Sequence, residues 1–244
     1  MGRDRGKLEE LAKDLAERFD VDTHVFVADF AQPGAVDALA SQVQAANLQV
    51  ETLVNNAGFG ISDAIEFTKT EDAKRLFDAD FFGMVNVNRA VIPHMRQAGA
   101  GRIVNLSSVA AAAPIPFQAY YSASKAAVRT YSLALASEVR PFGIEVCVIM
   151  PGDISTGFTA ARRKSCGGDD VYNGRIARSV AVMEHDERTG MSAQFAGQFV
   201  ARRATQKHPK LICTMGRKYA LFVFLMRILP TRTATRIVGR IYAS

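Results

Sequence analysis

The stretch that decides the fold runs from residue 102 to residue 125 and reads RIVNLSSVAAAAPIPFQAYYSASK. It opens on the strand-like run Arg102–Leu106, passes Ser108 and closes on a Tyr-x-x-x-Lys pair, Tyr121 and Lys125. Residues four apart share a face of a helix, so the phenol and the ammonium can point into one cleft. The stretch therefore predicts a strand, a loop that carries a serine, and a helix that presents a tyrosine and a lysine together.

This pair suits general acid/base catalysis. A free tyrosine titrates near about 10, which is too high for proton exchange at neutral pH. A lysine ammonium beside it favours the phenolate and lowers the tyrosine pKa toward the working range. Ser108 lies thirteen positions before Tyr121, and its hydroxyl can hydrogen-bond the oxygen that is being protonated. Such a pair also arises by chance, so its neighbours have to support it.

A second motif overlaps the same residues. Ser122 and Lys125 form Ser-x-x-Lys, the nucleophile motif of penicillin-binding enzymes. That chemistry needs companion Ser-Asp-Asn and Lys-Thr-Gly elements. The stretches Ser62–Ala64 and Lys69–Glu71 are near misses in the wrong order and at the wrong distance. An acyl-transfer enzyme is therefore disfavoured.

Strands and helices are predicted to alternate along the chain. The predicted helices are Leu8–Phe19, Val36–Val43, Glu71–Gln97 and Tyr121–Arg140. The predicted strands are His24–Ala28, Val50–Val54, Arg102–Leu106 and Ile144–Ile149. Alternation of this kind predicts an α/β fold with a doubly wound, mostly parallel, Rossmann-like sheet. The polar stretch Arg162–Gly190 carries no predicted element and looks adaptable.

Two predicted strands run into turns that suit a nucleotide site, because doubly wound sheets bind nucleotides outside the carboxyl ends of their strands. The first strand is followed by Asn55-Asn56-Ala57-Gly58 and the last by Pro151-Gly152-Asp153-Ile154-Ser155-Thr156. With Ser108 and the Tyr-x-x-x-Lys pair, in this order, the chain resembles the short-chain dehydrogenase/reductase family. The resemblance covers roughly residues 3–210.

The resemblance implies an NADP(H)-dependent oxidoreductase that transfers a hydride between nicotinamide and a carbonyl or secondary alcohol. Tyr121 would exchange the proton, Ser108 would hold the oxygen, and Lys125 would also bind the nicotinamide ribose. Asp80 stands where the family has an asparagine that anchors a proton-relay water, which puts that relay in doubt. The substrate pocket is expected to form from the Ala- and Pro-rich stretch Ala110–Phe117 and from Arg162–Gly190. With the hydrophobic tail, these segments favour a lipophilic substrate such as a steroid, retinoid or fatty-acyl derivative.

The resemblance also implies the cofactor residues. Arg3 matches a basic residue that clamps a 2′-phosphate, which favours NADP over NAD. Asp29 matches a carboxylate that binds the adenine amino group, although a capping or turn role is an equal alternative for a lone aspartate. The other matches lie in the two turns: Asn55, Ala57 and Gly58 beside the ribose, and Pro151, Gly152, Ile154 and Thr156 beside the nicotinamide.

The beginning of the chain departs from the family pattern. Members open with a strand and a Gly-rich T-G-x-x-x-G-x-G turn, whereas residues 2–11 here resemble the segment that comes after the second strand of such proteins. The Rossmann-like fold is therefore expected to be N-terminally incomplete, through either a start assigned too late or a truncated product. The alternative function is a truncated, non-catalytic remnant of the scaffold with impaired cofactor binding.

Length and composition favour one domain over residues 1–244. The chain is 48% hydrophobic and 22% charged, which permits a sizeable core. Its three cysteines lack C-x-x-C spacing and suit a reduced, cytoplasmic protein. The four histidines show no metal-ligand spacing, and no metal site is predicted. The opening residues are charged and helical in pattern, unlike a signal peptide.

Residues 210–244 are expected to form a basic, hydrophobic, helical extension. No Asp or Glu occurs from Thr189 onward, while the whole chain carries a net charge of +6. The apolar run Tyr219–Leu229 is too short to span a bilayer. It could cover the substrate cleft, pack on a partner subunit, or lie in a membrane interface as a peripheral contact. Nucleic-acid binding is disfavoured because no recognised nucleic-acid module accompanies the charge.

A homodimer or tetramer is also predicted. Helices Glu71–Gln97 and Tyr121–Arg140 resemble those that pair across two-fold axes in this family. Apolar side chains nearly encircle the first of them, and a helix that is apolar all round is buried somewhere. These residues are Phe77, Phe81, Phe82, Met84, Val85, Val87 and Val91.

Overall fold

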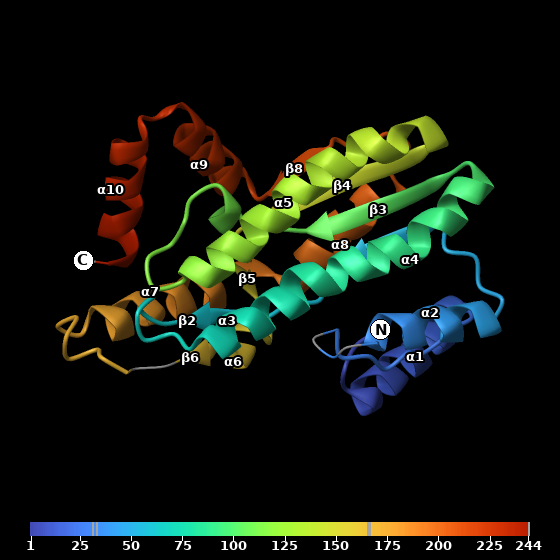
Figure 1. Cartoon of the computed structure of the whole chain (residues 1–244), viewed down its shortest axis with the longest axis horizontal. Helices are drawn as coiled ribbons and strands as arrows, with labels where there is room; N and C mark the ends of the chain where they lie inside the picture. Colours follow the sequence, from blue (N-terminus) through green and yellow to red (C-terminus); the bar gives the residue numbers. More distant parts are fainter. Residues whose placement is uncertain (31, 33, 165–166, 244) are drawn as a thin grey trace.

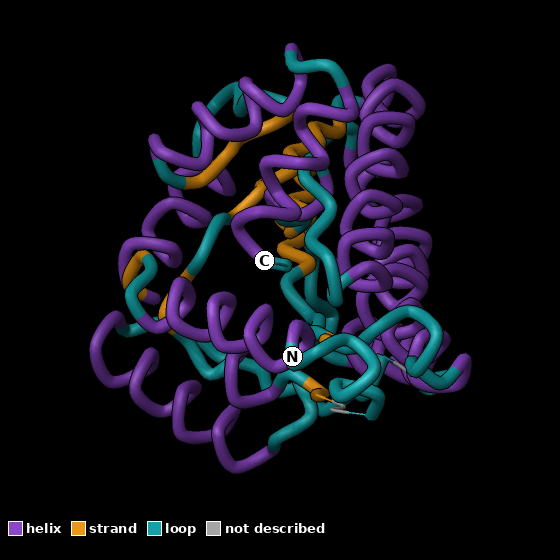
Figure 2. Tube along the Cα trace, turned by 90° about the vertical axis from the view of Figure 1, so that its left-hand side faces the viewer, coloured by secondary structure: helices purple, strands orange, loops and turns teal. Residues whose placement is uncertain are grey.

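A parallel sheet forms the centre of the molecule in the computed structural model, which describes residues 1–30, 32, 34–164 and 167–243. Its strands follow the order β1-β3-β4-β8, and every neighbouring pair is parallel. Their bounds are β1 Thr52–Asn55, β3 Gly101–Leu106, β4 Ile144–Pro151 and β8 Ile212–Met215. The predicted α/β fold is confirmed, because helices lie on both sides of this sheet (Figures 1 and 2).

Alternate side chains of the strands enter two different cores. Ile103 and Val146 pack with helices α4 (Gly83–Ala98) and α5 (Ala119–Val139) on one face. Val104 and Cys147 pack on the other face with helix α8 (Ala193–Thr205). Strands buried on both faces read as continuous apolar runs, which is why β3 and β4 are recognisable in the sequence.

The helical region predicted over Glu71–Gln97 is confirmed, but it is not a uniform α-helix. Helix α3 (Thr70–Phe77) passes into α4 through the π-helical turn η1 (Asp78–Phe82). A π-turn inserts an extra residue and rotates the side chains beyond it, and such turns are frequent at functional sites. Here the turn buries Asp80 and leaves Phe82 exposed.

A polar network lies inside the core beside this region. The Asn55 amide donates to Asn88 Oδ1 and Asn105 Oδ1, both at 2.8 Å. Asn105 in turn donates to Ser132 Oγ at 2.8 Å, and the Ser132 hydroxyl donates to the Val128 carbonyl. The network links β1, α4, β3 and α5. Because the buried amides have these partners, the asparagines fix how the helices sit on the sheet.

The N-terminal part differs from the prediction at one strand. Helices α1 (Arg5–Phe19) and α2 (Ala35–Ala45) form as expected. The predicted strand His24–Ala28 forms only a single parallel bridge, between Gly2 and Val27. Two backbone hydrogen bonds join this stretch to Gly2: the Ala28 amide donates to the Gly2 carbonyl, and the Gly2 amide donates to the Phe26 carbonyl. A ladder needs several paired residues in succession, and only one pair is present here.

The stretch Arg162–Gly190 was expected to be irregular, but it contains helix α7 (Arg175–Arg188). Its buried residues are Ile176, Ser179, Met183 and Glu187, which lie on one face of the helix. Two of these four side chains are polar, so the regular spacing of apolar residues that predicts an amphipathic helix is weak in this stretch. The burial of the Glu187 carboxylate is compensated by hydrogen bonds that it accepts from Arg162 and Thr159.

Short elements complete the chain. They are β2 Ile61–Ser62, η2 Val109–Ala111, η3 Arg140–Phe142, β5 Ile154–Ser155, α6 Phe158–Ala161, β6 Arg163–Lys164 and β7 Met191–Ser192. Strands β2 and β6 pair with each other, as do β5 and β7. Of the three cysteines, Cys147 and Cys213 are buried and free, and Cys166 lies outside the described residues.

The C-terminal segment is not wholly helical, because β8 is an edge strand of the central sheet. The helices begin later, as α9 (Arg217–Ile228) and α10 (Thr231–Tyr242), and Pro230 separates them. They form an angled hairpin at the end of the molecule away from α1 and α2 (Figure 1). In the part of the chain that the structure describes, no helix combines the length and apolar character needed to cross a bilayer.

Candidate active site

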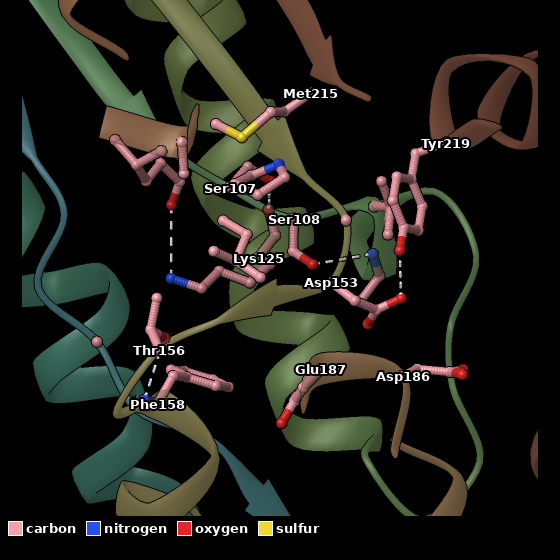
Figure 3. A pocket seen from close by; sticks show the side chains of 18 of the residues that line it. Ser107, Ser108, Lys125, Asp153, Thr156, Phe158, Asp186, Glu187, Met215 and Tyr219 are labelled. Atoms are coloured by element: carbon pink, nitrogen blue, oxygen red, sulfur yellow. Dashed lines mark hydrogen bonds between the residues drawn. The ribbon is translucent and has the colours of Figure 1, made fainter. Parts of the chain in front are cut away.

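Ser108, Tyr121 and Lys125 line one cavity of about 1100 Å³. Ser108 lies just beyond the carboxyl end of β3, while Tyr121 and Lys125 lie one turn apart on α5. Close up, the Ser108 and Lys125 side chains come from different elements and are held near each other (Figure 3). The predicted strand, serine loop and helix thus bring the three side chains to a common space.

Lys125 is buried, with 6% of its surface exposed, and several polar contacts hold its charged side chain there. Its Nζ lies 3.2 Å from Asp80 Oδ2 and 3.5 Å from the Leu106 carbonyl oxygen. The ammonium is 5.6 Å from the centre of the Tyr121 ring. The backbone of Lys125 is fixed as well, because its carbonyl accepts a 2.7 Å hydrogen bond from Ser107 Oγ.

Asp80 is more deeply buried than the lysine, with 2% of its surface exposed. Its Oδ1 accepts a 2.9 Å hydrogen bond from the Phe59 amide, and Ser124 Oγ donates to Oδ2 at 3.4 Å. The sequence suggested that Asp80 takes the place of a water-holding asparagine. In the structure its carboxylate pairs directly with the Lys125 ammonium.

The electrostatics of this cluster reverse one expectation. Burial raises the pKa of Asp80, and attraction to Lys125 offsets this only in part. Burial is the largest influence on Lys125 and favours its neutral amine, but the charge and hydrogen bond of Asp80 together with the charge of Tyr121 outweigh it and raise the lysine pKa. Lys125 was expected to lower the pKa of Tyr121, yet that pKa is raised, chiefly by burial and further by the charge of Asp80. The lysine ammonium and the Ser108 hydroxyl act in the lowering direction but do not prevail.

The residues assigned to the cofactor line two connected cavities. A smaller cavity of about 340 Å³ is lined by Arg3, Asp29, Asn55, Ala57, Gly58 and Asp80. The larger cavity is lined by Pro151, Gly152, Ile154 and Thr156 together with Tyr121 and Lys125. Both cavities share Val54, Asn56, Gly58 and Leu106 as lining residues. An elongated ligand can therefore extend from Arg3 to Tyr121.

These residues fit a dinucleotide in three respects. The two cavities adjoin along shared residues, the Arg3 guanidinium belongs to the lining of the smaller one, and Gly58 lies at the junction. A Cβ added to Gly58 would lie 2.9 Å from Asp80 Oδ1 and 3.2 Å from Lys125 Nζ. Only glycine therefore lets the backbone come this close to the ion pair. The Asn55 side chain faces the core network, so this residue meets the cavity through its backbone.

Several residues of the larger cavity were not predicted from the sequence. Tyr219 on α9 donates a 2.6 Å hydrogen bond to Asp153 Oδ2, and Figure 3 shows both side chains at one side of the cavity. Burial raises the pKa of Asp153. Asp153 belongs to the Pro-Gly-Asp-Ile-Ser-Thr stretch, so its position was recognisable. Tyr219 was not, because the two residues are 66 positions apart.

Comparison with known proteins assigns the chain to a family. A family model described as short chain dehydrogenase matches residues 1–167. The chain belongs to the short-chain dehydrogenase/reductase family and is an oxidoreductase of that family. Members of the family use NAD or NADP, and the parallel sheet with flanking helices is the fold of its solved structures.

Two curated relatives are similar over most of the chain. The 3-ketodihydrosphingosine reductase of Bacteroides thetaiotaomicron is 38% identical over 194 residues, which cover 79% of this chain and 72% of the relative. Sulfoacetaldehyde reductase 2 of Chromohalobacter salexigens is 34% identical over 188 residues, covering 76% and 73%. Both names describe reductases, and the substrates that they name are different.

Two solved structures show the same fold at 27% sequence identity. A short-chain dehydrogenase from Streptomyces avermitilis superposes with a TM-score of 0.80 over 95% of this chain and 85% of that chain. L-sorbose reductase from Gluconobacter frateurii, complexed with NADPH and L-sorbose, gives a TM-score of 0.69 over 88% and 83%.

The ion pair at Asp80 generates a pH prediction. Asp80→Asn removes the negative charge that raises the pKa of Tyr121, so the pKa of the phenol should fall as long as the Lys125 ammonium keeps its charge. A tyrosine that donates the proton in carbonyl reduction has to be protonated, so activity that depends on it is lost as the pH rises through its pKa. The alkaline limb of the kcat profile for reduction should therefore move to lower pH in the variant. Asp78→Asn, two positions away in the same π-turn, is the control and should leave the limb in place. An unmoved or raised limb in Asp80→Asn would contradict this account.

Proposed function

We propose that this protein is an NADP(H)-dependent reductase of a lipophilic ketone or aldehyde, which also runs in the reverse direction on the secondary or primary alcohol. The observation that carries the proposal is the joint position of Ser108, Tyr121 and Lys125 in an apolar cavity connected to the Arg3 cavity. When bound, the cofactor would supply the hydride. Every other role falls to side chains of this chain.

In this proposal Tyr121 donates its phenolic proton to the carbonyl oxygen as negative charge develops there. Ser108 holds that oxygen by a hydrogen bond. Lys125 fixes the phenol electrostatically and offers its ammonium to the cofactor ribose, while Asp80 holds the lysine in place. Pro151, Gly152, Ile154 and Thr156 would contact the nicotinamide, and Asn55, Ala57 and Gly58 would contact its ribose.

The lining of the larger cavity supports a lipophilic substrate. Apolar side chains from separate elements surround the space beside Tyr121: Ala110, Ala113, Ile115, Phe158, Met183, Phe222 and Val238. The Phe158 ring lies 5.7 Å from the Tyr121 ring, so the reacting carbonyl would sit against an apolar wall. The 38% identical relative is named for a sphingoid ketone, which also supports this substrate class.

Tyr121 carries the catalytic part of the proposal. Tyr121→Phe should keep the fold and cofactor binding while removing the proton donor, and kcat should fall by about 10²–10⁴-fold. Tyr120→Phe is the matched control, because Tyr120 is adjacent but displaced by about 100° around α5. Steady-state kinetics with a panel of lipophilic ketones would measure both variants. Equal losses in the two variants would show that the catalytic register is wrong.

Arg3 carries the preference for NADP. A guanidinium that contacts the 2′-phosphate stabilises it by about 1.5–3 kcal/mol, so Arg3→Glu should weaken NADPH binding by roughly tenfold to a hundredfold. NADH binding should change little. Fluorescence titration with both cofactors measures this directly on the chain as it stands. Arg5→Glu is the control, because the Arg5 guanidinium pairs with Glu9 at 3.3 Å. Equal weakening of NADPH and NADH would remove Arg3 from the phosphate site.

A non-catalytic scaffold is the second candidate function. One observation favours it: Arg3 and Asp29 adjoin the Gly2–Val27 bridge, which is not part of the four-stranded sheet. Among the described residues, these two cofactor residues therefore adjoin a single bridge and not a strand of the central sheet. Titration with NADPH up to millimolar concentration without a fluorescence change would favour the scaffold, and saturation at micromolar cofactor would favour the enzyme.

A cytoplasmic homodimer or tetramer completes the proposal. Phe82 supports it, because half of its surface is exposed on η1 although it is a large apolar side chain. Its ring contacts Phe81, which contacts Tyr131 on α5, so the two helices of the proposed interface are joined by aromatic rings.

Phe82→Glu should convert the oligomer to a monomer, because it places a charge in the apolar centre of the proposed interface. Light scattering after size exclusion measures the mass. Phe195→Glu is the matched control, since Phe195 is similarly exposed but lies on α8. A wild-type monomer at micromolar concentration would count against the interface.

A further inference from the structure

Helix α9 exposes an apolar face to solvent. Leu221, Phe224, Leu225 and Ile228 follow the spacing of one helix face, and three of them have exposed fractions of 57% to 60%. The opposite side of the same helix is used inside the protein, where Tyr219 and Phe222 line the cavity. An exposed row of large apolar side chains is a common mark of an interaction surface.

Helix α10 adds a basic face beside apolar side chains. Arg232, Arg236 and Arg240 recur every four residues, so they lie along one side of the helix. Ile237 and Ile241 stand next to this row and are also exposed. Among the described residues, no carboxylate forms an ion pair with any of these three arginines.

The charge of the two helices has a single sign. From Arg217 to the end of the chain there are six basic residues and no acidic one: Arg217, Lys218, Arg227, Arg232, Arg236 and Arg240. A surface that combines exposed Leu, Phe and Ile with unpaired arginines matches the interface of an anionic bilayer. Acyl chains would take the apolar face, and lipid phosphates would take the guanidinium groups.

The same helices border the cavity of the proposed active site. Phe222 of α9 and Val238, Ile241 and Tyr242 of α10 are lining residues. Ile241 both lines the cavity and has 43% of its surface exposed, so this edge of α10 stands at the cavity mouth. Both the exposed surface and the cavity lining therefore include residues of α9 and α10, which form one hairpin (Figure 1).

We propose that the α9–α10 hairpin docks on an anionic membrane surface and that a lipophilic substrate passes from the bilayer between these helices into the cavity. The docking depends only on the surface of the hairpin. The transfer of substrate rests on the proposed function.

Vesicle binding tests the docking step. The purified full chain would be sedimented with vesicles of phosphatidylcholine alone and of phosphatidylcholine mixed equally with phosphatidylglycerol, at low and high salt. We expect binding to the mixed vesicles, weaker binding at high salt, and little binding to the neutral vesicles. An absence of binding to the mixed vesicles overturns the proposal.

Two surface variants make the test specific. The triple variant Arg232→Gln, Arg236→Gln, Arg240→Gln should bind the mixed vesicles on the order of a hundredfold more weakly, at about one factor of five for each arginine. The double variant Leu221→Ser, Phe224→Ser should lose binding through the apolar face. Controls on α8 are Arg202→Gln for the charge and Phe195→Ser for the aromatic face, and both should bind like the wild type. Circular dichroism would confirm that each variant is folded.

A different outcome would assign the surface to a second copy of the chain. If the apolar double variant changes the mass of the oligomer while neither variant changes vesicle binding, the membrane proposal is overturned. The membrane proposal is also overturned if the hairpin variants bind vesicles as tightly as their α8 controls.

Turnover tests the transfer step and separates the two proposals. With a long-chain ketone embedded in mixed vesicles, the hairpin variants should lose rate in proportion to their loss of binding. With a short, soluble ketone they should keep the wild-type rate, because none of the substituted residues lines the cavity. If the wild type reduces neither ketone while it still binds vesicles, the proposed function fails and the docking stands. Equal loss on both ketones in the hairpin variants would contradict substrate entry from the membrane.

Discussion

The ammonium of Lys125 and the carboxylate of Asp80 face each other at 3.2 Å in a part of the molecule that is almost closed to water. The pair joins helix α5 to the π-turn η1, and Asp80 also holds the Phe59 amide in the loop after β1. Removing one member would leave a buried charge without a partner, at a cost of about 3–5 kcal/mol. Three elements that are distant in sequence thus depend on one ion pair, and the position of Tyr121 depends on it as well.

The asparagine network acts in the same region through neutral groups. Asn55 donates to the side-chain oxygens of Asn88 and Asn105 between the sheet and the helices, and Ser132 continues the network into α5. Because the Asn55 and Asn105 amides donate to fixed partners, a small displacement of α5 would leave these donors unsatisfied. The network therefore sets the height of α5 above the sheet, and the ion pair sets the orientation of its first turns. Together they define where the phenol and the Ser108 hydroxyl meet.

Much of this arrangement was predictable because it depends on local spacing. The four-residue interval from Tyr121 to Lys125 puts both side chains on one face of α5, and strands β1, β3 and β4 end within about two residues of their predicted ends. Features that depend on packing were not predictable. Helix α7 was not predicted because its buried side includes the polar residues Ser179 and Glu187, which interrupt the apolar spacing. The contact of Tyr219 with Asp153 joins residues 66 positions apart, so no local pattern indicates it. The rise in the pKa of Tyr121 was missed for the same reason, because burial is a property of the folded chain and not of the motif.

The ion pair also bears on the direction of the proposed reaction. A free ammonium near Tyr121 would stabilise the phenolate, the form that accepts a proton when an alcohol is oxidised. Asp80 compensates that positive charge, and burial penalises the phenolate further. Tyr121 therefore holds its proton to higher pH than a tyrosine beside an unpaired lysine would. The protonated phenol is the form that reduction of a carbonyl requires, so at neutral pH the site favours catalysis of reduction. A carboxylate at position 80 in place of an asparagine thus keeps Lys125 charged while it shifts the acid/base group beside it toward the donor form.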